Sequence, residues 1–133
     1  MAEYVLDSYA VLALLADEPG AADLAAMIEN QRNRFWMSAV NLGEVYYIVA
    51  RKEGEPAAVR TISDIQNQDN VTIVDGTLDR VLSAAKFKIR GGLSYADSFA
   101  CGLAAERGAV LLSGDPELKS LHEIAVLWPP TIQ

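Results

Sequence analysis

The sequence has 133 residues, and its composition of 51% hydrophobic and 22% charged residues is typical of a globular protein rather than a disordered one. Its length predicts a single domain over residues 1–133. The 11 basic and 18 acidic residues give a net charge of −7, which argues against a surface that is basic throughout but leaves room for a local basic patch.

The first half of the chain alternates short apolar runs with helical patterns. Apolar and β-branched runs predict strands, and apolar residues at helical spacing predict helices. In chain order we expect a strand at residues 4–6, helices at 8–16 and 21–30, a strand at 34–37, a helix from a Ser38 cap to about residue 52, a helix at 57–65 after the break at 53–56, and a strand at 71–74.

The second half continues the alternation. Here the helix signals are a capping serine and a terminating glycine, and the strand signals are short apolar runs. We expect a helix at residues 77–88, a loop at 90–92, a helix from a Ser94 cap to about 107, a strand at 110–112, a strand at 124–127, and closure of the fold at Pro129-Pro130.

Short apolar strands alternating with helices predict the fold class: a single α/β domain with a parallel sheet of about five strands, covered by helices on both faces. In such sheets, ligands bind outside the carboxyl ends of the strands. Residues that follow the strands are therefore the first candidates for a functional site.

Acidic residues gather where that rule predicts a site. Asp7 directly follows the first strand, and Asp115 lies just beyond the fourth. Asp97 falls in the first turn of a helix, and Glu44 in the second turn of another, at helix starts that share this edge. Clustered carboxylates repel one another unless a cation joins them, and oxygen-only ligands suit Mg2+ or Mn2+. The sequence thus predicts a divalent metal site that acts on phosphate esters.

Helix capping is the competing interpretation of the aspartates. Asp7 and Asp115 each stand where a helix N-cap would stand, and Ser94 with Asp97 fits a capping box. Glu44 is different, because it lies inside an apolar helical stretch, where a carboxylate needs a partner. Asn41 shares its helix face.

Four segments of the chain resemble the PIN domain, and specifically the VapC-type toxins of prokaryotic toxin–antitoxin modules. They are VLDSYA at 5–10, SAVNLGEV at 38–45, LSYADSFA at 93–100 and LSGDP at 112–116. The match extends along the whole chain, and its mild departures, such as serine at 113 where threonine is commoner, remove no carboxylate.

The resemblance implies a metal-dependent endoribonuclease that cuts structured RNA such as tRNA or rRNA. It also implies Mg2+ or Mn2+ as cofactor, a homodimer, and inhibition by a small cognate VapB-like antitoxin. By the same resemblance the acidic quartet is Asp7, Glu44, Asp97 and Asp115. Ser8 and Ser113 would orient carboxylates or water, with Asn41 as a further candidate.

Three basic residues, Lys86, Lys88 and Arg90, fall within five positions just before the Asp97 segment. They fit either an arm that steers RNA phosphates or the favourable cations of a helix C-terminus. We keep both interpretations at this point.

Cysteine content and the N-terminal segment indicate where the protein works. Cys101 is the only cysteine, so we expect no internal disulfide, no cysteine-based zinc cluster, and a reducing, cytoplasmic compartment. Glu3 and Asp7 interrupt the N-terminal apolar stretch, which argues against a signal peptide. No run approaches the roughly 18 apolar residues that cross a bilayer.

Two rival functions use the same acidic residues. One is phosphoryl transfer through an aspartyl phosphate on Asp7, which is disfavoured because Asp7 lacks a neighbouring aspartate and residues 124–128 contain no lysine. The other is a non-catalytic module of the same fold, whose acidic pocket would only grip a basic peptide.

Overall fold

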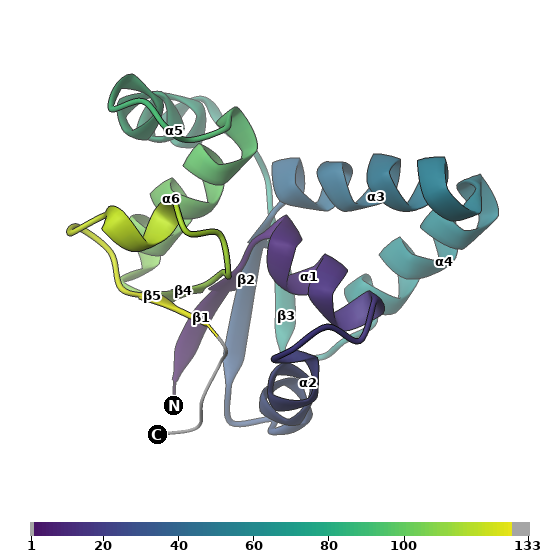
Figure 1. Cartoon of the computed structure of the whole chain (residues 1–133). Helices are drawn as coiled ribbons and strands as arrows, with labels where there is room; N and C mark the ends of the chain where they lie inside the picture. Colours follow the sequence, from purple (N-terminus) through teal and green to yellow (C-terminus); the bar gives the residue numbers. More distant parts are fainter. Residues whose placement is uncertain (1, 129–133) are drawn as a thin grey trace.

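The computed structural model describes residues 2–128 (Figure 1). Its strands are β1 (Glu3–Leu6), β2 (Arg34–Ser38), β3 (Val71–Val74), β4 (Val110–Leu112) and β5 (Val126–Leu127). Its helices are α1 (Ser8–Leu15), α2 (Ala21–Glu29), α3 (Ala39–Glu53), α4 (Glu55–Gln66), α5 (Leu78–Ile89) and α6 (Tyr95–Arg107), with a 3-10 turn η1 (Leu118–Ser120). Among these residues, no helix is long and apolar enough to cross a bilayer.

The five strands form one parallel sheet in the order β3-β2-β1-β4-β5. The chain therefore moves outward from β1 in one direction, and then crosses back to build β4 and β5 on the other side. The reversal falls between β1 and β4. In open parallel sheets this is the position where neighbouring loops diverge and a ligand crevice forms. The expected α/β class and parallel sheet are confirmed.

Alternating side chains of the central strands pack into two separate hydrophobic cores, one on each face of the sheet. Val5 of β1 and Leu111 of β4 point to one face, and Leu6 and Leu112 point to the other. In Figure 1, α5 and α6 lie on one side of the sheet, and α1 to α4 lie on the other. Both faces are thus covered, which explains why the strands read as continuous apolar runs.

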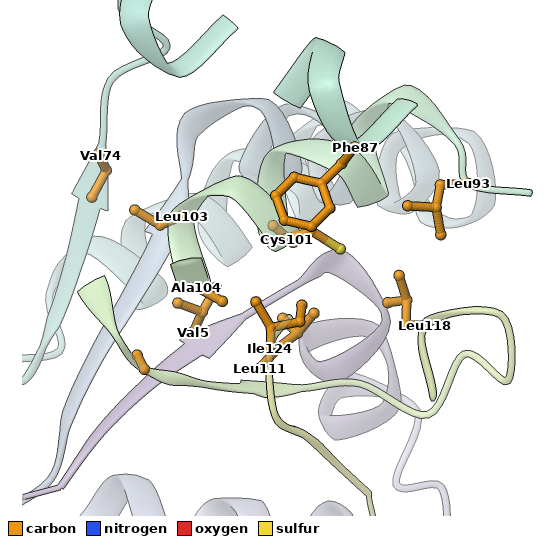
Figure 2. Packing of buried hydrophobic residues seen from close by; sticks show 12 residues of the cluster. Val5, Val74, Phe87, Leu93, Cys101, Leu103, Ala104, Leu111, Leu118 and Ile124 are labelled. Atoms are coloured by element: carbon orange, nitrogen blue, oxygen red, sulfur yellow. The ribbon is translucent and has the colours of Figure 1, made fainter. Parts of the chain in front are cut away.

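The core under α5 and α6 includes the single cysteine. Figure 2 shows Phe87 and Cys101 gathered with Leu111, Leu118 and Ile124 over the sheet. Cys101 is fully buried, and burial raises the pKa of its thiol to about 12. A thiol in this environment stays protonated and serves as a small packing group.

Helix starts and breaks agree closely with the sequence signals. Ser38 caps α3 through a 3.2 Å bond from the Val40 amide, and Thr77 caps α5. Gly54, with a φ of 94°, separates α3 from α4, and Pro56 occupies the first turn of α4. These devices set where α3 begins, which in turn sets the position of Glu44.

The differences concentrate after β4. A helix N-cap was expected at Asp115-Pro116, but only the 3-10 turn η1 follows. The last strand is shorter than expected: Ile124 is buried in the core before the strand begins at Val126. The predicted closure at Pro129-Pro130 lies outside the described residues.

Candidate active site

The four predicted acidic residues come from four segments that meet at the carboxyl edge of the sheet. Asp7 ends β1, Asp115 follows β4, Glu44 lies in the second turn of α3, and Asp97 in the first turn of α6. Because β1 and β4 are neighbours, Asp7 and the Asp115 turn flank the point where the strand order reverses. The site therefore lies where the topology predicts a crevice.

Asp7 is the buried member of the set, with no exposed surface. One carboxyl oxygen caps α1 by accepting a 2.8 Å hydrogen bond from the Ala10 amide. The other oxygen has no hydrogen-bond partner among residues 2–128. Burial, reinforced by the nearby charges of Asp97 and Asp115, raises the pKa of Asp7 to about 7. A helix cap requires only one carboxyl oxygen, so the capping role of Asp7 does not account for its buried second oxygen.

Asp97 belongs to the capping box of α6 and also to the acidic cluster. Ser94 Oγ accepts a 3.0 Å bond from the Asp97 amide, and Asp97 Oδ2 accepts a longer one, 3.4 Å, from the Ser94 amide. The expected capping box is thus present. Burial raises the pKa of Asp97, and the negative charges of Asp115 and Glu44 add to this effect. Asp97 therefore lies in the electrostatic field of both other acids.

A third carboxylate joins Asp97 and Asp115. Oxygens of Asp97, Asp115 and Glu117 all lie within 4.8 Å of one another, close enough to share one ion. The turn after β4 produces this arrangement, since Asp115 Oδ1 accepts a 3.0 Å bond from the Glu117 amide. Sequence reasoning missed Glu117. The available signal was an acidic residue two positions after Asp115. It was overlooked because a helix was expected to begin at Pro116.

Glu44 is tethered from two sides. The Ser8 hydroxyl, at the start of α1, donates to one Glu44 oxygen, and Tyr47 donates to the other at 3.3 Å. Ser8 is buried, whereas Glu44 is only partly buried, so its carboxylate is less enclosed than its apolar helix suggested. These bonds supply the partners that a carboxylate in this stretch requires.

The two remaining polar candidates hold backbone around the acids. Ser113 is fully buried, and its Oγ accepts a 3.2 Å bond from the Asp115 amide. Asn41 is also fully buried, and its Nδ2 donates to the Ala96 carbonyl at 3.0 Å. Ser113 thus shapes the turn of Asp115, while Asn41 joins α3 to the start of α6 beside Asp97.

The basic cluster is largely engaged within the protein. Lys88 donates to the Leu93 carbonyl at 2.5 Å, and Arg90 pairs with Glu123. Arg90 also lies 4.9 Å from the Phe87 ring centroid. Lys86 is exposed near the end of α5. Lys88 and Arg90 therefore hold the loop before α6, and an RNA contact by these three residues stays a prediction.

Comparison with known proteins adds a family and close relatives. The profile of the PIN domain matches residues 4–124. The chain is 31% identical over 115 residues to the VapC ribonuclease Mb0640 of Mycobacterium bovis, covering 81% of this chain and 86% of that protein. The same values hold for ribonuclease VapC30 of Mycobacterium tuberculosis.

Solved structures of low sequence identity share the fold. VapBC2 from Rickettsia felis, bound to a DNA fragment from its promoter, has a TM-score of 0.73 at 14% identity and covers 94% of this chain and 97% of that one. VapC20 of Mycobacterium tuberculosis, described as a toxin that cleaves the sarcin–ricin loop, has a TM-score of 0.70 at 18% identity, with coverages of 92% and 98%.

Proposed function

Because this chain belongs to the PIN-domain family and is related to the VapC ribonucleases, we propose that it is a metal-dependent endoribonuclease and the toxin of a toxin–antitoxin pair. The observation that carries the proposal is the acidic site itself, with a buried Asp7 oxygen that has no partner among the described residues. A non-catalytic module that grips a peptide is not favoured, since the relatives are named ribonucleases.

The donor set fits a divalent cation. Asp97, Asp115 and Glu117 offer oxygens within 4.8 Å of one another, and Asp7 offers the unpartnered oxygen. Carboxylates alone suit Mg2+ or Mn2+, and neither a histidine nor a cysteine ligand is required. Asp7 and Glu44 are not members of this close group, so we assign Asp97 and Asp115 as the main residues that would hold the ion, with Asp7 through its unpartnered oxygen and Glu117 as an exposed further ligand. Such an ion, when bound, supplies Lewis-acid activation of a water and neutralises charge on the phosphate.

The chain's own side chains position the reaction. Glu44, held by Ser8 and Tyr47, is the carboxylate that accepts a proton from the attacking water. Ser113 fixes the backbone at Asp115, and Asn41 fixes the backbone before Asp97. The site is strongly acidic, so it repels RNA until a cation is bound, and this repulsion makes cleavage depend on metal.

An antitoxin of opposite charge fits the same surface. The net charge of −7 and the acidic site favour a basic partner that places an arginine or lysine against the carboxylates. Related VapC-type structures were solved as VapBC complexes.

A homodimer through α5 fits the exposed apolar residues of this helix. Leu78, Leu82 and Ile89 are 71%, 53% and 83% exposed, and their spacing places them on one helix face. Asp79 lies at the start of α5, and Lys86 and Lys88 lie near its end. Two copies of α5 packed antiparallel about a two-fold axis therefore bring acidic ends against basic ends.

The test is cleavage of a structured RNA panel by the purified toxin. The wild type should cut RNA with Mg2+ or Mn2+ and lose cleavage in EDTA. Asp7→Asn, Asp97→Asn and Asp115→Asn should each lose cleavage by orders of magnitude, because asparagine keeps a cap but not the charge. Near-normal cleavage by folded Asp7→Asn and Asp97→Asn would refute the assignment of this site.

A further inference from the structure

An unusually close contact joins α1 to the turn that carries Asp115. A Cβ atom at Gly114 would lie 2.5 Å from Tyr9 Cε1, 2.6 Å from Cζ and 2.7 Å from Oη. Ordinary van der Waals contacts of a Cβ fall between 3.4 and 4 Å. Gly114 is not among the glycines with positive φ, so its backbone does not require glycine. A side chain at position 114 would therefore require the Tyr9 ring to move.

A second aromatic contact restricts the Tyr9 ring. Trp128 packs edge-on against it, with the ring centroids 5.5 Å apart and an interplanar angle of 84°. The Trp128 indole in turn lies against Gly20, where a Cβ would meet Cε2 at 3.0 Å. Tyr9 is 38% exposed, so its contacts cover most of its surface. Tyr9 is therefore a surface residue whose ring Trp128 and Gly114 contact on parts of its face and edge.

The position of this contact relates it to the metal site. Tyr9 lies two residues after Asp7, and Gly114 lies between Ser113 and Asp115. Packing Tyr9 on Gly114 therefore connects the segment of one assigned ligand to the turn of another. Two other bonds already shape this region: the Asp115 amide donates to Ser113 Oγ, and the Ala10 amide donates to Asp7. These bonds act within each segment, whereas the Tyr9 contact acts between them.

We propose that Tyr9 is a positioning residue of the metal site, whose ring packs on Gly114 and holds the Ser113–Asp115 turn at its place beside Asp7. The inference rests on the proposed function and adds to it a residue that touches neither the cation nor the RNA. The role belongs to the ring, because its Cε1 and Cζ atoms are the nearest to a Cβ at Gly114. Glycine at 114 is then a requirement of the site.

Four single variants test the proposal by calorimetric binding of Mn2+ alone, with thermal melts of the metal-free proteins as a check of folding. Tyr9→Phe keeps the ring and should bind Mn2+ as the wild type does. Tyr9→Ala and Gly114→Ala should each weaken binding about tenfold, the scale for removing a group that orients a ligand. Gly43→Ala is the matched control, since it lies beside Glu44 and its Cβ would meet nothing within 4 Å.

A double variant separates positioning from general damage. If the added methyl harms the site only by displacing the ring, Gly114→Ala should lose its effect in the Tyr9→Ala background. Equal penalties of Gly114→Ala in both backgrounds, or wild-type affinity in Tyr9→Ala, would overturn the proposal. RNA cleavage by the wild type is scored separately. The expected Mn2+ pattern without any RNA cleavage would refute the nuclease assignment alone, whereas a wild type that binds no Mn2+ would refute both.

Discussion

Ser8 on α1 donates a hydrogen bond to the carboxylate of Glu44 on α3, 36 positions away in the sequence. The bond joins the residue after Asp7 to the acid that we assign to proton transfer. Since Ser8 is 6% exposed, solvent offers little replacement for its hydroxyl. Asp7 and Glu44 are thereby connected through the first turn of α1, which carries Ser8.

Ser8→Ala should lower RNA cleavage by about tenfold, because Glu44 loses the donor that orients it. The unfolding free energy should fall by at most about 3 kcal/mol, the upper end of the usual range for a hydrogen bond to a charged group. Ser8→Thr keeps the hydroxyl and should retain cleavage. Initial rates on one RNA and thermal melts measure both effects. Wild-type rates in Ser8→Ala would show that the tether is dispensable.

The raised pKa of Asp7 predicts how metal-free stability depends on pH. The folded protein holds a proton at Asp7 up to a pKa of about 7, whereas an unfolded chain releases it near the ordinary value of 3.8. Between these values the folded state binds more protons, so the free energy of unfolding falls as pH rises from about 4 to about 7.

Asp7→Asn should remove most of this dependence and be more stable than the wild type at pH 8. Some slope should remain, because burial also raises the pKa of Asp97. Denaturant titrations in EDTA at several pH values measure the difference between the two proteins. Parallel curves for the wild type and Asp7→Asn would mean that Asp7 does not titrate in this range.

Glu117→Gln should weaken Mn2+ binding severalfold, and less than Asp97→Asn does. Glu117 is exposed, so water replaces its oxygen more readily than it replaces that of a partly buried aspartate. Melting temperatures should stay near that of the wild type, as expected for a surface substitution. Glu18→Gln, at an exposed position after α1, is the control for loss of one negative charge. Equal effects of the two substitutions would indicate only a long-range charge effect.

Leu82→Glu should convert a dimer into monomers in light scattering after size exclusion. A carboxylate buried in an apolar contact costs well over about 1.4 kcal/mol, so the dissociation constant should rise at least about tenfold. Val59→Glu places the same charge on an exposed apolar position of α4, 57% exposed, and should leave the dimer intact. Loss of the dimer in both variants, or in neither, would argue against α5 as the interface.

Local sequence signals explain why much of this fold could be predicted from the sequence. Ser38, Thr77 and Ser94 cap the helices where they were expected or within one residue, because each side chain satisfies amides that the helix itself leaves free. The convergence of Asp7 and Asp115 at one edge follows from the rule that parallel strands share their carboxyl ends.

Contacts between distant segments were beyond the reach of the sequence. Nothing in the local pattern around Tyr9 indicates that its ring lies on Gly114. Likewise, the sequence left Lys88 and Arg90 as either an RNA-steering arm or the cations of a helix C-terminus, and it gave no sign that Lys88 bonds the Leu93 carbonyl or that Arg90 pairs with Glu123. Glu117 was missed for a related reason, since a 3-10 turn replaced the expected helix.

The pairing of β1 with β4 has a consequence for a toxin during its own synthesis. Asp7 is synthesised long before β4, so its strand lacks this neighbour until Val110–Leu112 have emerged from the ribosome. Asp97, Asp115 and Glu117 also lie far downstream of Asp7 in the sequence. A nascent chain that has not yet reached Asp115 and Glu117 therefore carries no assembled site. Sheet order therefore delays assembly of the site until β4 and the turn that follows it have been made.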